Sequence, residues 1–310
     1  MFVDRFMRTE LGSLTSIKTG KLDANASSEN GIYPFFTCAV EPLKIDSYSY
    51  DCECVLVAGN GDLNVKYYNG KFDAYQRTYI IESKDKSKLT VPYLYYFLES
   101  YIETLRNQSI GGIIKYIKLG NLTNAPIPVL SIKEQNEIVK TLDKAKSIIT
   151  HIRTQLEKLD LLVKARFVEM FGDPVSNPYN WEKISLGKLA EIKIGPFGSL
   201  LHKEDYVQNN HALINPSHII NSKVFADMKL TVSDEKYEEL RAYQLFTGDV
   251  VMGRRGEMGR CAVITESGLL CGTGSMIIRT NGRLKADYIQ KIISFPSFKK
   301  TIEAVSYTHL

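Results

Sequence analysis

The stretch from Ser131 to Phe171 constrains the fold of this chain more than any other. Apolar residues alternate along it in steps of four and three, and neither glycine nor proline interrupts the run. Ser131 and Glu134 match a capping box, and Gly172 begins a helix stop. The pattern predicts one helix of about 38 residues, roughly 57 Å long. Its apolar seam consists of Ile138, Leu142, Ala145, Ile149, Ile152, Leu156, Leu159, Val163 and Met170.

This seam is narrow, so it calls for a partner helix rather than a broad protein core. The alternative is an ordinary helix that faces its own core, but helices of globular proteins are rarely this long. We therefore expect residues 131–173 to form a stiff coiled-coil spacer that also docks partners.

Length and composition set only broad limits. A chain of 310 residues can hold two domains and a connector. A net charge of +4 and a pI of about 8.6 permit a nucleic-acid partner without requiring one. No apolar run approaches the length of a membrane span, and the start has no secretory signal, so a cytoplasmic protein without membrane contact is expected. The five cysteines form no CxxC pair, and neither structural zinc nor disulfides are expected.

The chain repeats one module before and after the predicted helix. Leu, Gly, Leu, Ile, Lys and Gly recur at identical spacing in Leu11–Gly20 and Leu186–Gly195. The apolar run and glycine loop at Val55–Asp62 are matched by Val250–Glu257, and about 20 additional residues in the second copy fall within 202–241. Later strands at 79–81 and 276–278 each precede a short amphipathic helix, at 92–106 and 285–295.

These runs of β-branched and aromatic residues, broken by Gly, Asn and Asp, predict an α+β fold with two tandem recognition modules. The modules are assigned to residues 1–130 and 174–310. The second copy ends without the glycine loop, strand and long helix that close the first one, so a C-terminally truncated second module is expected, with residues 307–310 not native to it.

The loops carry hydrogen-bonding and positively charged side chains but no known catalytic motif. Arginine can bind guanine bidentately, Asn and Gln can bind adenine, and Lys suits phosphates. For a single residue, ordinary solvated polarity is the more common explanation. For the set in two equivalent loops, DNA binding is as good an explanation as solvated polarity. The candidates are Lys18, Lys21, Asn60, Asn64, Lys66, Tyr67, Gln76 and Arg77 in the first module, and Lys193, Ser199, His202, Lys203, Arg254, Arg255 and Arg260 in the second.

Together these features resemble the DNA specificity subunit of type I restriction–modification systems. The resemblance covers residues 1–305. It rests on the two Leu-Gly-x-Leu-x-x-Ile-x-x-Gly starts, the Gly-Asp-Val-Val-Met-Gly-Arg-Arg-Gly-Glu-Met-Gly-Arg run at 248–260, Ile127–Leu130 leading to Glu134-Gln135, and the helix end at 164–173. The first module departs from the second, because Asn60-Gly61-Asp62 stands where the second has its arginine-rich loop.

The resemblance implies a non-catalytic subunit that reads a bipartite site in double-stranded DNA, one module per half-site. It also implies docking of two methyltransferase subunits and, through them, of motor-nuclease subunits. S-adenosylmethionine, ATP and Mg²⁺ would belong to those partners, and no cofactor or metal is expected here. Two alternatives stay open: a protein-binding coiled-coil scaffold with duplicated domains, which the mild charge suits, and, less favoured, an enzyme with a site built into the repeats.

Overall fold

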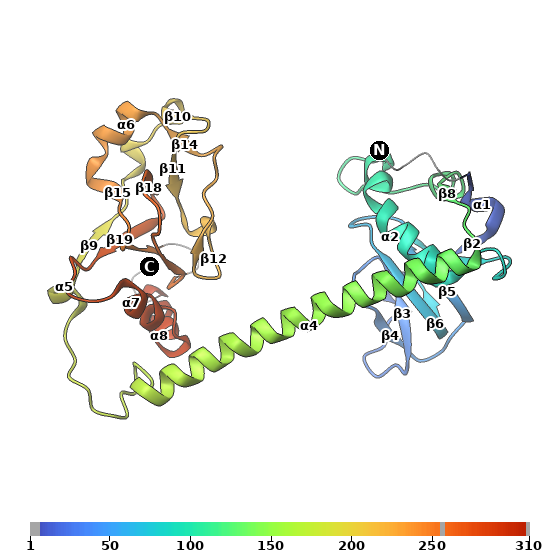
Figure 1. The fold of residues 1–310 in the computed structure, drawn as a ribbon, viewed down its shortest axis with the longest axis horizontal. Helices are drawn as coiled ribbons and strands as arrows, with labels where there is room; N and C mark the ends of the chain where they lie inside the picture. The colour runs from blue at the N-terminus through green and yellow to red at the C-terminus, as the bar shows by residue number, and fades with distance from the viewer. Residues whose placement is uncertain (1–6, 255–257, 308–310) are drawn as a thin grey trace. The chain divides into compact units, whose positions relative to one another are not determined.

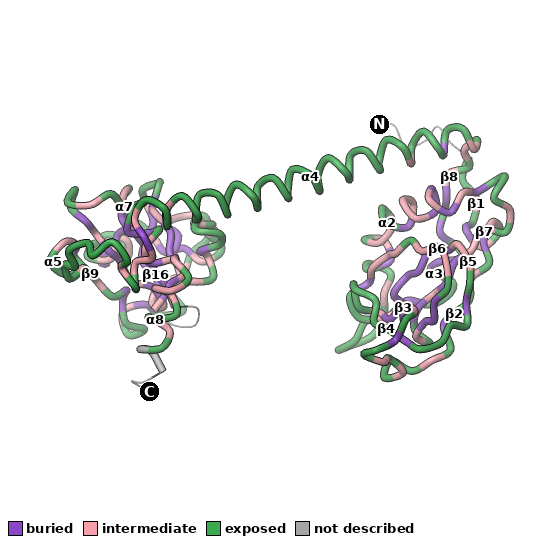
Figure 2. The backbone as a smooth tube through the Cα atoms, turned by 90° about the horizontal axis from the view of Figure 1, so that it is seen from below, coloured by how far each residue is buried: buried purple, intermediate pink, exposed green. Residues whose placement is uncertain are grey.

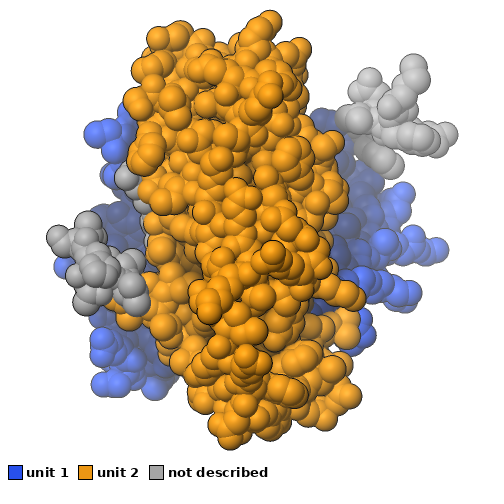
Figure 3. All heavy atoms as spheres, turned by 90° about the vertical axis from the view of Figure 1, so that its left-hand side faces the viewer, with its two compact units in different colours: residues 1–156 blue, residues 157–310 orange. Residues whose placement is uncertain are grey.

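The computed structural model describes residues 7–254 and 258–307. The chain forms two compact units, domain 1 (residues 1–156) and domain 2 (residues 157–310), which Figure 3 colours separately. The division falls inside the long helix α4, Ile132–Phe171. The assignment of modules to residues 1–130 and 174–310 stays a prediction. Each domain is described by itself.

Domain 1 is built on one curled six-stranded sheet. Strands β3 and β6 pair in parallel, and the other neighbours are antiparallel. Strand β5 is buried on both faces, because Val55 and Val57 pack under helix α2 while Cys54 and Leu56 pack on the opposite side. The strand order is β2 (Thr15–Thr19), β7 (Thr78–Ser83), β5 (Tyr50–Ala58), β6 (Val65–Ala74), β3 (Tyr33–Phe36) and β4 (Leu43–Ile45).

Helix α2 (Val91–Gln108) covers one face of this sheet (Figure 1). Thr90 caps it by accepting a hydrogen bond from the Tyr93 amide, and a proline occupies its first turn. Leu94, Leu98 and Leu105 recur at helical spacing and are fully buried. The remaining elements of domain 1 are β1 (Arg8–Glu10) paired with β8 (Pro126–Pro128), η1 (Ala24–Ala26) and the short helices α1 (Leu11–Leu14) and α3 (Leu119–Thr123).

In its described residues, domain 2 has a four-stranded sheet, a five-stranded sheet and the two-stranded hairpin β12–β13. The four-stranded sheet runs β17 (Cys261–Val263), β16 (Val250–Gly253), β19 (Ser275–Arg279), β9 (Glu191–Ile194). The five-stranded sheet runs β10 (Tyr206–Val207), β14 (Thr231–Val232), β11 (His211–Ile214), β18 (Leu269–Cys271), β15 (Gln244–Leu245). The other elements are α5 (Leu186–Leu189), η2 (Gly198–Leu200), η3 (Lys203–Asp205), η4 (Pro216–His218), β12 (Ile219–Ile220), β13 (Lys223–Val224), α6 (Asp234–Glu239), η5 (Arg241–Tyr243), and, after the last strand, α7 (Ala286–Ile293) and α8 (Pro296–Tyr307).

The predicted repeat is present in the topology. The order β2-β7-β5-β6 in domain 1 matches β9-β19-β16-β17 in domain 2, with the same antiparallel pairings. Both copies begin with a four-residue helical turn, α1 and α5. The additional residues of the second copy include the hairpin β12–β13 and helix α6, which lie within the predicted range.

Two equivalent glycines, Gly20 and Gly195, lie where two backbone segments approach each other closely in each domain. The Gly20 amide donates to the Thr78 carbonyl at 3.0 Å, and the Gly195 amide donates to the Ser275 carbonyl at 2.9 Å. A Cβ atom on Gly20 would lie 2.1 Å from the Ala74 carbonyl oxygen, and one on Gly195 would lie 2.1 Å from the Gly272 carbonyl oxygen. Glycine is therefore required at both positions by the close backbone approach.

Helix α4 is continuous over 40 residues, about 60 Å, as the seam predicted. The capping box forms as expected: the Ser131 amide donates to the Glu134 carboxylate at 2.8 Å, and the Glu134 amide donates to the Ser131 hydroxyl at 3.3 Å. Gly172 ends the helix with a φ of +76°, and its amide donates to the Val168 carbonyl at 2.8 Å.

A buried glutamine holds the start of α4 in domain 1. Gln135 is 1% exposed. Its Oε1 accepts from the Thr90 amide at 2.9 Å and from the Thr90 hydroxyl, and its Nε2 donates to the carbonyls of Lys88 and Leu130. All of its hydrogen-bonding capacity is therefore used, and the first turn of α4 is tied to the first turn of α2.

About two helical turns after Gln135, α4 contacts helix α2 again. Tyr96 donates to the Asp143 carboxylate at 2.5 Å. The Lys146 ammonium donates to the Tyr95 hydroxyl and to Glu99, and lies 4.9 Å from the centre of the Tyr95 ring. These contacts fix the direction in which α4 leaves α2.

The end of α4 is fixed within domain 2 by aromatic packing. The Phe167 ring lies 5.7 Å from the Phe295 ring, and the Phe171 ring lies 5.6 Å from the Tyr288 ring. The indole of Trp181 donates to the Phe171 carbonyl at 3.0 Å. Aromatic pairs at these separations contribute about 0.5–1.5 kcal/mol each beyond their area.

Between these anchors the apolar seam faces solvent, as the exposed colour along α4 in Figure 2 shows. Ile149, Ile152, Leu156 and Leu159 keep 48–57% of their surface exposed. The helix itself is confirmed; its pairing with a second helix stays a prediction.

Within the described ranges 7–254 and 258–307, no helix is long and apolar enough to span a membrane.

Substituting Gln135 with alanine is expected to lower the free energy of unfolding of domain 1 by about 2–4 kcal/mol, because it leaves buried donors and acceptors unpaired. Urea-dependent hydrogen exchange of domain 1 amides measures the change. Gln155→Ala is the matched control, since Gln155 is exposed on the same helix, and it should change stability by less than about 0.5 kcal/mol. Equal effects of the two substitutions would contradict the anchor.

Substituting Gly20 with alanine is expected to destabilise domain 1, and Gly195→Ala to destabilise domain 2, each by about 1–3 kcal/mol through overpacking against backbone. Domain-resolved hydrogen exchange again separates the two effects. Gly120→Ala and Gly198→Ala are controls, since a Cβ at either position meets nothing within 4 Å. If Gly20→Ala were as mild as Gly120→Ala, the close approach would be refuted.

Candidate nucleic-acid interface

Six predicted site residues of domain 1 gather at one end of the sheet. The ends of β2 and β5 meet the starts of β6 and β7 there, because these strands alternate in direction. Backbone hydrogen bonds tie the segments together, including Lys21 N to Ala74 O and Gln76 N to Leu22 O. The six residues are Lys21, Asn60, Asn64, Lys66, Gln76 and Arg77.

Asn64 organises this end rather than presenting a free amide. Its Nδ2 donates to the Cys38 carbonyl at 2.8 Å and to the Asp62 carbonyl at 2.9 Å, and its Oδ1 accepts from the Lys66 ammonium. Burial lowers the pKa of Lys66. The side-chain amide of Asn64, which was predicted to bind a base, thus has its hydrogen-bond partners within the protein.

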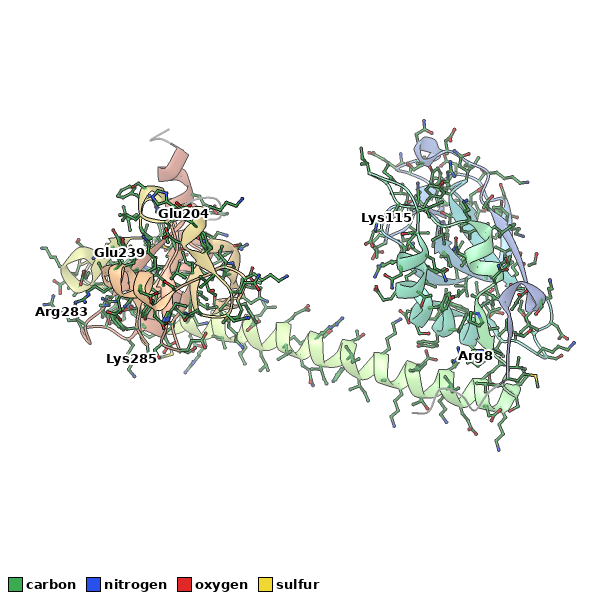
Figure 4. All side chains as sticks on the ribbon, turned by 90° about the horizontal axis from the view of Figure 1, so that it is seen from above. Arg8, Lys115, Glu204, Glu239, Arg283 and Lys285 are labelled. Carbon is green, nitrogen blue, oxygen red and sulfur yellow. The ribbon has the colours of Figure 1, made fainter. Side chains whose placement is uncertain are left out.

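Asn60 lies beside a hairpin that the candidate set did not include. Residues 110–116 pair with themselves through Ile110 and Tyr116, and Tyr116 also bridges to Asn60. Ile113 at the tip of this hairpin is fully exposed. Lys115, two residues later, is labelled in Figure 4. Gly111-Gly112 between β-branched residues was the sequence signal for this turn.

Lys18 and Tyr67 lie further along their strands and are engaged with carboxylates. The Lys18 ammonium lies 2.6 Å from Glu82, and this hydrogen bond raises the pKa of Lys18. Tyr67 donates to Glu53 at 2.8 Å, and burial together with this bond raises the pKa of Tyr67 to about 12. Both side chains would have to give up an internal partner to contact a ligand.

In domain 2, Arg254 and Arg260 lie at the equivalent end of the four-stranded sheet. The Gly253 amide donates to the Arg260 carbonyl at 2.9 Å, and Nε of Arg254 donates to the Thr273 carbonyl at 3.2 Å. Nη1 of Arg260 donates to the Pro216 carbonyl at 3.3 Å. Arg255 lies outside the described residues.

The remaining candidates of domain 2 lie on β9 and on the segment that follows it. The Lys193 ammonium lies 5.3 Å from the centre of the Tyr243 ring. Ser199 on η2, His202 directly before η3 and Lys203 on η3 are all exposed, between β9 and β10. Leu201, between them, is buried against the five-stranded sheet, so this segment belongs to that sheet's surface.

The buried cysteines are poor nucleophiles. Burial raises the pKa of Cys261 and of Cys271 to about 12. The thiolate, which is the reactive form, is therefore not populated near neutral pH.

Comparison with known proteins identifies the family. The model for the type I restriction modification DNA specificity domain matches residues 4–160, just over half of the chain. The chain belongs to this family. The match includes domain 1 and most of α4, so the polar end of the six-stranded sheet is part of a DNA specificity domain.

Curated relatives of the family match the chain over part of their length. The specificity subunit of the type I restriction enzyme EcoDI from Escherichia coli is 39% identical over 155 residues, 50% of this chain and 34% of that protein. The MjaVIII specificity subunit from Methanocaldococcus jannaschii is 20% identical over 229 residues, 68% of this chain and 53% of that protein. The chain thus spans about a third to a half of these specificity subunits.

Solved structures show the same fold. The S subunit of a type I restriction–modification system from M. genitalium matches with a TM-score of 0.60 and 16% identity, covering 99% of this chain and 81% of that one. A structure of type I complex assembly and conformational transition matches with a TM-score of 0.51 and 14% identity, covering 94% and 80%. At these identities the likeness concerns the fold: two recognition domains joined by a long helix.

Proposed function

We propose that this chain reads a bipartite target in double-stranded DNA as a type I specificity subunit, one domain per half-site. The observation that carries the proposal is the shared polar end: the same end of the equivalent sheet bears arginine in both domains, with lysine and amide side chains beside it in domain 1. Arginine and amide side chains suit base edges, while lysine and backbone amides suit phosphates.

Helix α4 would act as the spacer of this reader. Gln135 holds the start of this helix in domain 1, and Phe167 and Phe171 hold its end in domain 2, so the helix would set the distance between the two readers. Half-sites read from one face of DNA lie about one helical turn, roughly 34–36 Å, apart. The spacer between the half-sites would follow from the number of residues in α4.

Partners would use the exposed faces of α4. Two methyltransferase subunits supplying S-adenosylmethionine chemistry would dock there, and motor-nuclease subunits using ATP and Mg²⁺ would join through them. This chain would contribute no catalytic group of its own, and it would act in the cytoplasm, where its DNA substrate is.

A protein-binding scaffold is the second candidate, favoured by the exposed seam at Ile149, Ile152, Leu156 and Leu159. Exposed apolar surface of this extent marks a contact with another protein. The seam is also what a spacer with docked subunits requires. DNA binding by the domains therefore separates the two candidates.

Selection from random duplexes by the full chain, co-expressed with a type I methyltransferase subunit, is expected to yield two short specified segments around an unspecified spacer. Affinity for that site should fall steeply with salt, with a slope of about −0.9 per neutralised phosphate, because bound phosphates release counterions. Non-specific competitor should displace it only at large excess. Enrichment of no motif, or binding insensitive to salt, would leave the scaffold as the better description.

Inserting one heptad after Thr154 is expected to shift the length of the selected spacer, because seven residues add roughly 10.5 Å of helix while they keep the seam in phase. Replacing seven exposed residues there without changing the length is the control, and it should leave the spacer unchanged. The measurement is the motif selected by each variant. A spacer indifferent to the insertion would refute the proposed role of α4.

A further inference from the structure

In each domain, the pairing of two central strands continues to one last pair of opposed residues, here called the last rung. This rung consists of an arginine and a glycine in both domains, but the strand that carries the arginine differs. In domain 1 the pairing Val57–Tyr79 and Ala58–Thr78 continues to Gly59 opposite Arg77. The Gly59 amide donates to the Arg77 carbonyl at 2.8 Å.

Domain 2 contains the same rung with the residues exchanged. The pairing of β16 with β19 continues from Gly253–Ser275 to Arg254 opposite Gly274. The Arg254 amide donates to the Gly274 carbonyl at 2.9 Å, the counterpart of the bond in domain 1. Directly opposed residues of an antiparallel pair project to the same face of a sheet. One arginine therefore lies at this position in each domain: Arg254 directly after β16 in domain 2, and Arg77 directly before β7 in domain 1.

Steric contacts explain why domain 1 takes its arginine from the other strand. A Cβ on Gly59 would lie 2.4 Å from the Arg77 carbonyl oxygen, so no side chain fits there. The Tyr79 ring also lies against Gly59, 3.0 Å from that Cβ. In domain 2 the glycine is less confined: a Cβ on Gly274 would lie 3.1 Å from the Pro216 ring, which a small shift relieves.

Among the described residues, the arginine of domain 2 is held through Nε rather than through its two Nη atoms. Nε of Arg254 donates to the Thr273 carbonyl at 3.2 Å. No described residue takes a hydrogen bond from its two Nη atoms or forms an ion pair with it. Arg77 is exposed and likewise has no such partner among the described residues. A guanidinium whose two Nη atoms have no partner among the described residues can donate to the O6 and N7 acceptors of guanine.

We infer that Arg77 and Arg254 are equivalent base-reading arginines, each contacting a guanine in the half-site of its own domain. This inference rests on the proposed function and deepens it. It also resolves the apparent difference between the two loops: the first loop, Gly59-Asn60-Gly61-Asp62, lacks arginine, but the neighbouring strand supplies one to the same rung.

Duplex selection with single variants tests the assignment. Arg77→Ala should weaken binding of the selected site by roughly 5- to 150-fold and remove the preference at one guanine of one half-site, leaving the other half-site intact. Arg254→Ala should do the same for the other half-site. Lys88→Ala in domain 1 and Arg241→Ala in domain 2, both exposed charges elsewhere, are controls that should change neither half-site. The assignment would be overturned if both arginine variants lost base preference in the same half-site, or if neither variant lost any base preference.

The exchange variant is the sharper test. Arg254→Gly combined with Gly274→Arg moves the arginine to the strand that carries it in domain 1. We expect it to regain the guanine preference that Arg254→Gly alone loses. A folded exchange variant that behaves like Arg254→Gly would refute the equivalence of the two positions.

Arg77→Lys and Arg254→Lys keep the charge without the fork and do not depend on the exchange variant folding. Each should lose the guanine preference of its half-site while affinity for other sequences stays within a few-fold. If the alanine variants instead weaken all sequences alike and reduce the salt slope by about one, the arginines bind phosphate and the inference is wrong. If the unaltered chain selects no bipartite motif at all, it is the proposed function that fails.

Discussion

The continuity of helix α4 between its two sets of anchors is the constraint on which the rest of the structure depends. Gln135 ties its first turn to α2 through four hydrogen bonds, and Phe167 and Phe171 pack its last turns against Tyr288 and Phe295. A helix has no internal hinge unless proline, glycine or a bulge interrupts it. Neither proline nor glycine occurs between Ile132 and Phe171, so α4 carries none of the residues at which helices usually kink.

The middle of α4 has no packing of its own. Every residue from Ser147 to Arg166 is exposed, so no apolar side chain of this stretch is buried in a core. Apolar side chains held in water forgo about 25 cal/mol for each Å² that a partner would cover. The seam is thus a surface whose stabilisation depends on association, and the proposed docking of subunits would supply it.

The two domains are equivalent in backbone geometry more than in side-chain position. Gly20 and Gly195 occupy the same close approach, and the hydrogen bonds from Gly59 to Arg77 and from Arg254 to Gly274 occupy the same rung. A duplicated reader can therefore diverge in sequence while it keeps a functional group at one place. Such an exchange between strands is invisible to an alignment that follows the chain, because the two positions are distant in sequence.

The sequence by itself determined the features that depend on local chemistry. The heptad seam, the Ser131–Glu134 capping box and Gly172 specified α4 almost to the residue, since helix periodicity and caps act within a few positions. The repeated Leu-Gly motif identified the duplicated module for the same reason. Only the tertiary structure decided which candidates stand together: it brought Arg77 beside Gly59, placed Lys18 against Glu82 and used up the amide of Asn64. Strand register and cross-strand contacts join residues far apart in the chain, and no local pattern encodes them.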